Sequence, residues 1–240
     1  MASSGSKTYV LVHGAYHGGW CWKDVADRLR GLGHTVYTPT LTGLGERSHL
    51  MCCKPTLETF IEDVAQVIKY EELDDVILVG HSFGGSAVSG VADRMPEKLR
   101  HLVYLDAQVL QNGQSSATLN PPRVEAYRQR AQTGDGIGVP PPDDVSAYGI
   151  TDPVMAQWVK KMLTPHPLQV YYDTINLRHP VGNGVRATYI ACAKPLHEAT
   201  AKAREFAKSV PGWNYVEIPT GHNAMMLMPA ELTELLAGIE

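Results

Sequence analysis

A single serine stands between glycines at the end of an apolar run, in the stretch VILVGHSFGGSAVSGV at residues 76–91. The apolar run predicts a buried strand, and the residues after the serine predict a helix. A G-x-S-x-G pattern in that context is typical of a nucleophile elbow, whose tight turn requires small flanking residues, here Gly80 and Gly84. Such a turn raises the Ser82 hydroxyl above the carboxyl ends of the strands, where open sheets bind ligands. A serine in an ordinary glycine turn is the weaker interpretation, because it leaves this context unexplained.

Strand-like and helix-like segments alternate on both sides of this motif. Strands are expected at residues 8–14, 34–40, 74–82, 99–107, 186–193 and 214–219. Helices are expected at residues 24–33, 56–70, 84–95, 199–209 and 229–239. Such alternation predicts an α/β fold with a mostly parallel sheet of about six strands and helices on both faces.

Between residues 108 and 184 this alternation stops. The stretch NPPRVEAYRQRAQTGDGIGVPPPDDVSAYG is rich in proline and glycine, and residues 152–164 and 167–175 resemble short helices. An irregular segment of that length inside a compact domain is usually functional. We therefore expect a core made of residues 1–107 and 185–240, with a helical lid inserted at 108–184.

A serine hydroxyl is a weak nucleophile, so a base must accept its proton, and a histidine late in the chain is expected to do so. Among the 10 histidines, His222 in PTGHNAM is favoured, because it follows an apolar strand in a glycine-containing loop and precedes one closing helix. A developing oxyanion needs preorganised amides. One is expected from Phe83, which follows the serine, and the other from Ala15 in HGAYHGGW, with Gly14 keeping the backbone close to the substrate.

The ordered set VLVHGAYHGGWCW, GHSFGG and GHNAM resembles the α/β-hydrolase superfamily. Within it, the chain is similar to small single-domain esterases, a group that includes plant methylesterases, hydroxynitrile lyases and bacterial carboxylesterases. The similarity covers nearly the whole chain apart from the predicted lid. PTLTGLGERSHL, YLDA and GHNAM resemble most closely a bacterial branch that includes esterases acting on methyl carbamates of the carbendazim type. The resemblance implies a serine hydrolase with a Ser-His-Asp catalytic triad and an oxyanion hole.

The acid of that triad is missing from its usual place. The resemblance implies an aspartate in the loop after the penultimate strand, where ACAKPLHEAT has Lys194 and Pro195. Asp106, at the end of HLVYLDA, lies where relatives such as haloalkane dehalogenases hold a relocated acid, and Glu198 lies in the usual loop. We favour Asp106 and keep Glu198 as the alternative, because a carboxylate at the end of a central strand is costly to bury without a partner. Each acid also has a non-catalytic interpretation. Asp106 could form an ion pair with a nearby Arg or Lys, and Glu198 could be an exposed acid in the first turn of a helix.

Candidate substrate-binding residues are one glycine and several bulky side chains near these motifs, although aromatic and methionine side chains more often belong to a core. They are Gly14, Tyr16, Trp20, Phe83, Trp158 and Met225. Cys21 beside this set is a candidate for oxidation sensitivity, with simple packing as the favoured alternative. The 4 cysteines form no C-x-x-C pair, so we expect reduced thiols without a metal or disulfide role.

Composition narrows the class of partner. The net charge is −4 and the 21 Lys and Arg residues form no long run, which indicates neither nucleic-acid binding nor membrane-surface binding. No apolar stretch is long enough to span a bilayer, and the apolar run at 9–12 is too short for a signal peptide. We therefore expect a cytoplasmic protein whose partner is a small-molecule ester, with no cofactor and no metal. The oligomeric state stays open, with a homodimer as one alternative.

Hydroxynitrile lyases share the scaffold that the resemblance implies, so the reaction needs a separate argument. Those lyases have a threonine in the first loop and a lysine directly after the histidine, where this sequence has Gly14 and Asn223. The expected function is therefore hydrolysis of a small carboxylic or carbamic ester, including a methyl carbamate of the carbendazim type, through an acyl-enzyme intermediate. A hydroxynitrile lyase and a non-catalytic receptor for a small ligand are the alternatives. The sequence leaves open whether the substrate is an ester, a lactone or a carbamate.

Overall fold

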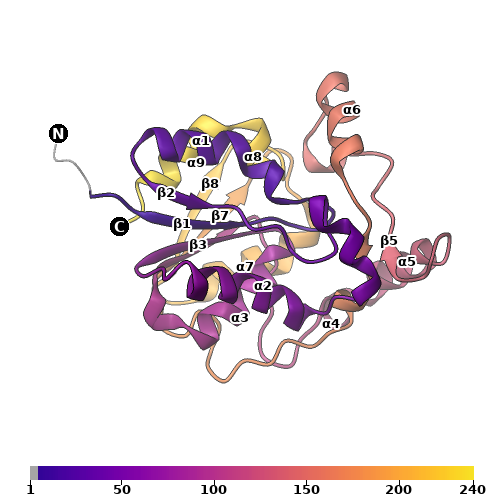
Figure 1. The fold of residues 1–240 in the computed structure, drawn as a ribbon, viewed down its shortest axis with the longest axis horizontal. Coiled ribbons are helices and arrows are strands. Elements are labelled where there is room, and N and C mark those ends of the chain that lie inside the picture. Colours follow the sequence, from indigo (N-terminus) through magenta and orange to yellow (C-terminus); the bar gives the residue numbers. More distant parts are fainter. Residues whose placement is uncertain (1–4) are drawn as a thin grey trace.

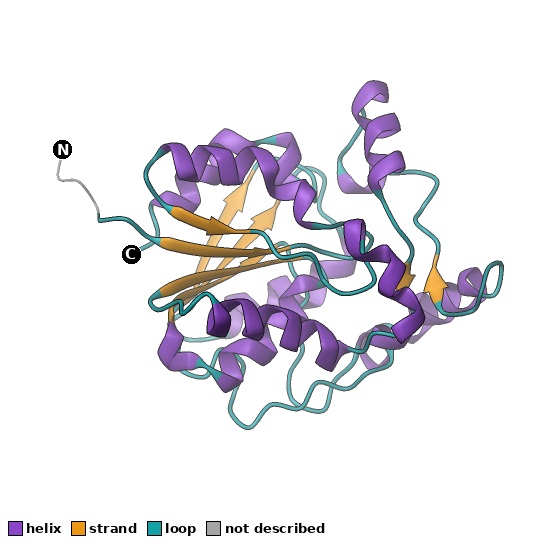
Figure 2. Cartoon of the chain, viewed as in Figure 1, coloured by secondary structure: helices purple, strands orange, loops and turns teal. Residues whose placement is uncertain are grey.

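The computed structural model describes residues 5–240, so the first four residues of the predicted core lie outside the described residues. Six strands form one parallel sheet in the order β2-β1-β3-β4-β7-β8. Figure 2 shows its strands between layers of helices. The strands are β1 (Thr8–Val12), β2 (Thr35–Tyr37), β3 (Val76–His81), β4 (Leu99–Leu105), β7 (Ala187–Cys192) and β8 (Asn214–Ile218). The predicted α/β sheet is confirmed. Each strand is shorter than its predicted segment, because terminal residues such as Gly14 and Ser82 leave the sheet for loops.

Helices cover both faces of this sheet, as the alternation predicted (Figure 1). One face carries α1 (Lys23–Gly31), α8 (Ala224–Leu227) and α9 (Pro229–Ala237), and the other carries α2 (Leu57–Tyr70), α3 (Gly84–Arg94) and α7 (Ala201–Ser209). Side chains of β1 alternate between the two cores: Tyr9 and Leu11 pack on the α1 face, Val10 and Val12 on the α2 face. Because both faces are covered, β3 is buried along its whole length.

Local signals explain where two of these helices begin. The Thr56 hydroxyl accepts a hydrogen bond from the Thr59 amide and caps α2, whose apolar residues Ile61 and Val64 then face the sheet. At the end of the chain, the sequence predicted one closing helix, but α8 precedes α9. Pro229 separates them, because it has no amide hydrogen and so cannot continue the helix before it.

Most of the segment 108–184 lies beyond the carboxyl end of β1, and its last part runs back along α3, where the Arg178 amide donates to Asp93 (Figure 1). It contains α4 (Ser116–Leu119), α5 (Pro121–Ala131), α6 (Pro153–Met162) and a two-stranded antiparallel sheet of β5 (Gly138–Val139) and β6 (His166–Pro167). The small sheet was not predicted. Residues 167–175 were expected to be a short helix, but only Gln169–Tyr171 form a single 3-10 turn. Beyond Tyr171 the backbone bonds to a distant segment instead of continuing a helix: the Ile175 amide donates to the Gln114 carbonyl at 2.8 Å.

Two further observations concern the described residues 5–240. None of the helices in this range combines the length and the apolar character that crossing a bilayer requires. Within the same range, no group of three or more His, Cys, Asp or Glu side chains is arranged to hold a metal ion.

Candidate active site

Ser82 occupies a sharp turn between β3 and α3. Its backbone has a φ of 53°, in the left-handed region that residues with side chains seldom adopt. Two backbone hydrogen bonds hold the turn, from the Ser82 amide to the Leu105 carbonyl at 3.2 Å and from the Gln108 amide to the Ser82 carbonyl at 2.8 Å. A Cβ atom on Gly84 would lie 2.6 Å from the His13 carbonyl oxygen, so this position requires glycine. The predicted strand, tight turn and helix are therefore present around the serine.

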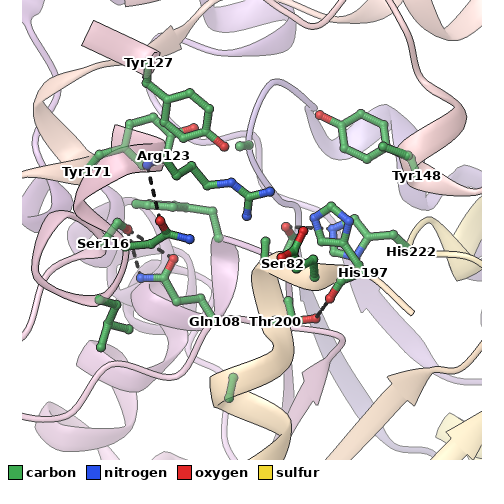
Figure 3. A pocket seen from close by; sticks show the side chains of 18 of the residues that line it. Ser82, Gln108, Ser116, Arg123, Tyr127, Tyr148, Tyr171, His197, Thr200 and His222 are labelled. Carbon is green, nitrogen blue, oxygen red and sulfur yellow. Dashed lines mark hydrogen bonds between the residues drawn. The ribbon is translucent and has the colours of Figure 1, made fainter. Parts of the chain in front are cut away.

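A chain of hydrogen bonds joins Ser82 to two residues from distant parts of the sequence. Ser82 Oγ lies 2.9 Å from His222 Nε2, and His222 Nδ1 lies 2.7 Å from Asp106 Oδ2. Figure 3 shows Ser82 and His222 side by side at one end of a cavity. The three residues follow β3, β4 and β8, whose carboxyl ends meet at one edge of the parallel sheet. Glu198, the alternative acid, is exposed in the 3-10 turn Glu198–Thr200, and the structure does not bring it to His222.

The second oxygen of Asp106 has its own partners. Asp106 Oδ1 accepts a hydrogen bond from the Thr200 hydroxyl at 2.9 Å, and Arg204 Nη1 lies 3.5 Å from it. Arg204 also donates to the Thr200 hydroxyl at 2.6 Å. Burial raises the pKa of Asp106 to about 6, and the Thr200 hydrogen bond and the Arg204 charge act against that rise. The carboxyl group is therefore ionised at neutral pH, although it is fully buried.

Sequence reasoning missed Thr200 and Arg204. They lie four residues apart at the start of α7, so both side chains project from the same face of a helical turn. That spacing, next to the loop from which the usual aspartate is absent, was the available signal.

Burial and neighbouring groups favour the neutral form of the His222 imidazole. Burial lowers its pKa well below the usual value, and the neighbouring His197 ring, stacked with a centroid separation of 4.0 Å, lowers the pKa further. With Nδ1–H donating to Asp106, the Nε2 lone pair can accept a proton from Ser82. His81 Nε2 lies 3.0 Å from the His222 carbonyl oxygen and contacts the backbone that carries the imidazole. The arrangement can therefore deprotonate a serine hydroxyl.

The two amides expected to stabilise an oxyanion lie beside Ser82. Ala15 and Phe83 both line the cavity, from the loop after β1 and from the start of α3. In the part of the chain that the structure describes, neither amide donates to a protein acceptor. Both N–H groups are therefore available to a ligand oxygen.

The loop that carries Ala15 is fixed by His13 and approaches Ser82 through Gly14. A Cβ atom on Gly14 would lie 2.6 Å from the Ser82 Cβ atom. The close contact that requires glycine here is therefore with the Ser82 side chain. His13 lies 2.8 Å from the Gly14 carbonyl through Nδ1 and accepts from the Leu41 amide through Nε2 at 3.0 Å. These bonds hold the loop backbone in place.

A cavity of about 500 Å³ opens next to Ser82 and His222, in the size range of small-molecule sites. The core contributes the serine end, and the segment 108–184 contributes much of the remaining wall. Four tyrosines line it: Tyr16, Tyr127, Tyr148 and Tyr171. The site is therefore a chamber with many aromatic side chains in its wall, together with polar groups such as Ser82, Gln108 and Arg123.

Four of the predicted substrate-binding residues lie outside the lining of this cavity. Tyr16 and Phe83 line it, but Gly14, Trp20, Trp158 and Met225 do not. The Trp20 ring stacks on His17 at 5.4 Å and packs edge-on against Trp158 at 5.3 Å. Met225 is fully buried in the core on the α1 face of the sheet, because the first turn of α8 directs it away from the serine. Closeness in sequence to the motifs did not predict which face these side chains occupy.

The four cysteines are free thiols and none lines the cavity. Cys21 and Cys192 are buried, and burial raises the pKa of each thiol. Cys52 and Cys53 are exposed. Cys21 packs in the core on the α1 face, as the packing alternative expected.

Comparison with known proteins identifies the family. The model of the alpha/beta hydrolase family matches residues 9–235, so the chain belongs to that family and the resemblance seen in the sequence is confirmed. The chain is 42% identical over 242 residues to the carbendazim hydrolyzing esterase of Nocardioides sp. (strain SG-4G), covering 96% of this chain and 98% of that protein. These matches support a carboxylic ester hydrolase.

Two further likenesses show how widely the scaffold is used. The chain is 36% identical over 100 residues to the alpha-hydroxynitrile lyase of Arabidopsis thaliana, covering 41% of this chain and 39% of the lyase. An extracellular alpha/beta-hydrolase from a Paenibacillus species has a TM-score of 0.85 at 24% identity, covering 97% of this chain and 98% of that one. The structural likeness concerns the fold, so the reaction must be argued from the site.

Proposed function

We propose that the protein is a serine hydrolase that cleaves a small carboxylic or carbamic ester through an acyl-enzyme intermediate. Ser82 is the nucleophile, His222 the general base and Asp106 the acid of the triad. The observation that carries this proposal is the hydrogen-bond chain from Ser82 Oγ to His222 at 2.9 Å and from His222 to Asp106 at 2.7 Å.

The first half of the reaction transfers the acyl group to the enzyme. Ser82 Oγ attacks the carbonyl carbon while its proton passes to His222 Nε2, and the new imidazolium is stabilised by the Asp106 carboxylate. The amides of Ala15 and Phe83 donate to the oxyanion, and loss of one such donor typically costs on the order of a hundredfold or more in rate. The intermediate then expels the alcohol, which takes the proton from His222, and leaves an ester on Ser82.

The second half regenerates the serine. His222 Nε2 removes a proton from a water molecule, whose oxygen attacks the acyl-enzyme carbonyl. The same two amides hold the second oxyanion. When that intermediate collapses, Ser82 Oγ leaves and recovers its proton from His222, and the carboxylic or carbamic acid is released.

The segment 108–184 acts as a lid in this proposal, with residues 1–107 and 185–240 as the core. The support is that its tyrosines, Tyr127, Tyr148 and Tyr171, form part of the cavity wall beside a buried His222. A lid excludes bulk water, which strengthens the electrostatic interactions at the oxyanion.

A methyl carbamate of the carbendazim type is one candidate substrate within this class. The support is the 42% identity, over nearly the whole of both chains, to an esterase named for carbendazim hydrolysis. A carbamate carbonyl is attacked by serine in the same way as a carboxylic ester, so the proposed residue roles apply to both.

The test is a substrate panel with wild type and Ser82→Ala. The panel contains methyl esters, p-nitrophenyl acetate, lactones and methyl carbamates including carbendazim, and mass spectrometry detects an acyl group on the intact protein. We expect hydrolysis of at least one ester class by wild type, with none above background by Ser82→Ala. Turnover retained by Ser82→Ala contradicts the nucleophile assignment, and tight binding without turnover indicates a receptor.

Hydroxynitrile cleavage is the second candidate, favoured by the local identity to the plant lyase. Against it, the residue after His222 is a neutral amide: Asn223 Nδ2 donates to His17 Nε2 at 3.1 Å and offers no cation for cyanide. Release of cyanide from mandelonitrile, measured beside p-nitrophenyl acetate hydrolysis, separates the two. Faster cyanide release than ester hydrolysis contradicts the esterase proposal.

A further inference from the structure

One cation in the cavity wall, Arg123, has no ion-pair partner among the described residues. Arg123 projects from α5 into the chamber, and its guanidinium lies between Tyr127 and the Ser82 end (Figure 3). Across residues 5–240, no carboxylate forms an ion pair with it and its side chain donates no hydrogen bond to a protein acceptor. Arg128 on the same helix differs, because it donates to Glu125 through two nitrogens at 2.8 and 2.6 Å.

The other charged groups of the cavity wall are held by the protein. The Lys202 ammonium donates to the Leu119 carbonyl at 2.6 Å, and the Arg130 guanidinium donates to the Pro140 carbonyl. Asp144 accepts from the amide and hydroxyl of Ser146 at 2.8 and 2.7 Å. Glu198 is exposed at the rim. Arg123 is thus distinguished by having its donors free inside the chamber.

Such a cation near the catalytic base opposes the proposed reaction. The His222 imidazole must become positively charged when it takes the serine proton. Burial lowers the pKa of His222 most, followed by the neighbouring His197 and His17. The positive charge of Arg123 lowers it further. An anion bound to Arg123 removes this penalty, because it balances the charge that the imidazolium would face. A neutral substrate leaves the penalty in place.

We propose that Arg123 determines specificity, and that the cavity accepts small esters carrying a second, ionised carboxylate, such as half-esters of dicarboxylic acids. This inference rests on the proposed ester hydrolysis at Ser82. A planar guanidinium matches a carboxylate with two parallel hydrogen bonds, which suits it to hold one end of the substrate. The tyrosine walls then contact the carbon chain between that carboxylate and the scissile ester. Both oxyanion amides remain free for the other end.

The test compares acids with their neutral amides. The probes are monomethyl succinate, glutarate and adipate, each paired with the methyl ester of the corresponding monoamide, so that only the charge at the far end differs. We expect wild type to prefer the acid over the amide in kcat/KM for at least one chain length. The expected ratio is roughly 10- to 100-fold, the range for a hydrogen bond to a charged group. High salt should reduce it, because the pair is partly screened.

Substitutions test whether Arg123 causes the preference for acids over amides. Arg123→Met should reduce the acid-to-amide ratio to about one and raise kcat/KM for the amides, whereas Arg123→Lys should keep part of the ratio. Arg128→Met is the matched control, because it removes a cation from the same helix outside the cavity, and it should keep the wild-type ratio. Circular dichroism verifies that each variant is folded.

Two results would contradict the inference, and they differ in what they imply for the proposed function. If wild type hydrolyses p-nitrophenyl acetate but shows no preference for any acid, or if Arg123→Met keeps the preference, the inference about Arg123 is wrong and the proposed function stands. If wild type hydrolyses no ester at all, both are wrong.

Discussion

Asp106 shows how much of the site depends on individual side chains. Its two oxygens have different partners, His222 on one and Thr200 with Arg204 on the other. An uncompensated buried carboxylate would be protonated at neutral pH, and these partners counteract that tendency. The charge that the proposed base requires is therefore maintained by residues that do not touch a substrate.

Replacing the acid tests its assignment directly. Asp106→Asn should lower kcat for p-nitrophenyl acetate by roughly 10³- to 10⁴-fold, because the amide cannot hold His222 in the correct tautomer or stabilise the imidazolium. Glu198→Gln should change kcat little, since Glu198 is exposed and makes no contact with His222. A large loss in Glu198→Gln with a small loss in Asp106→Asn would reverse the assignment.

The pH profile should reflect the same carboxyl group. The pKa of Asp106 is raised to about 6, so the carboxylate is ionised above that pH and protonated below it. Burial lowers the pKa of His222, so protonation of its imidazole would add to the loss of activity at acidic pH. We expect kcat/KM to fall as the pH decreases through about 6 and to be flat above about 7. An acid limb near the ordinary aspartate value would contradict this expectation.

Arg204 should set the position of that limb. Its positive charge lowers the pKa of Asp106, so Arg204→Met should move the acid limb to higher pH, and Arg204→Lys should restore most of the shift. The kcat/KM profile of each variant measures this. If Arg204 has only a structural role, its replacement should lower the rate without changing the pH at which kcat/KM falls.

At the scale of elements, the order of the strands brings the site together. β1 lies between β2 and β3, so the loops that leave β1 and β3 start beside each other and diverge. The β1 loop supplies Ala15, and the β3 turn supplies Ser82 and Phe83. The close approach of these two loops requires Gly14, whose neighbour across the gap is the serine side chain.

Adding one methyl group at this contact tests its tightness. In Gly14→Ala, the new Cβ would lie 2.6 Å from the Ser82 Cβ and 3.0 Å from His81 Nδ1, so the loops must separate. We expect a stability loss of about 1–3 kcal/mol and at least a tenfold loss of kcat. Thermal unfolding and p-nitrophenyl acetate hydrolysis measure the two effects.

Gly31→Ala is the matched control for that substitution. Gly31 ends α1, and a Cβ there meets nothing within 4 Å. Its stability should stay the same or rise by up to about 1 kcal/mol, because alanine is the better helix former, and its activity should not change. Equal losses in the two glycine variants would refute the steric explanation.

At the scale of the whole molecule, packing decides which groups solvent reaches. The buried thiols are far apart in the sequence: Cys21 lies in the 3-10 turn before α1, and Cys192 ends β7. The exposed thiols, Cys52 and Cys53, end the 3-10 helix Gly45–Cys53. Residue type alone could not separate these pairs. Their reactivity therefore reports on the intact fold.

A thiol titration measures that packing. With a disulfide reagent, the native protein should show about two fast-reacting thiols, Cys52 and Cys53, and all four should react in denaturant, because burial raises the pKa of Cys21 and Cys192. Esterase activity should survive the fast phase, since neither exposed thiol lines the cavity. Inactivation during the fast phase would contradict this picture.

Local signals in the sequence were sufficient to predict the parallel sheet, the turn at Ser82 and the position of His222 beside it, because periodicity, small residues and chain order can be recognised without the fold. The same signals failed for Met225 and Trp20, whose side chains point to faces that only packing determines. They also gave no sign of the β5–β6 pairing, which joins residues far apart in the chain.

The sequence by itself determined the fold class, the proposed nucleophile and the short list of possible acids. Only the tertiary structure decided which carboxylate reaches His222, which residues keep it charged, and that Arg123 forms no ion pair among residues 5–240. The physical reason is that a hydrogen bond needs its partners within about 3 Å, and side chains separated by more than a hundred residues meet at that distance only after the sheet has formed.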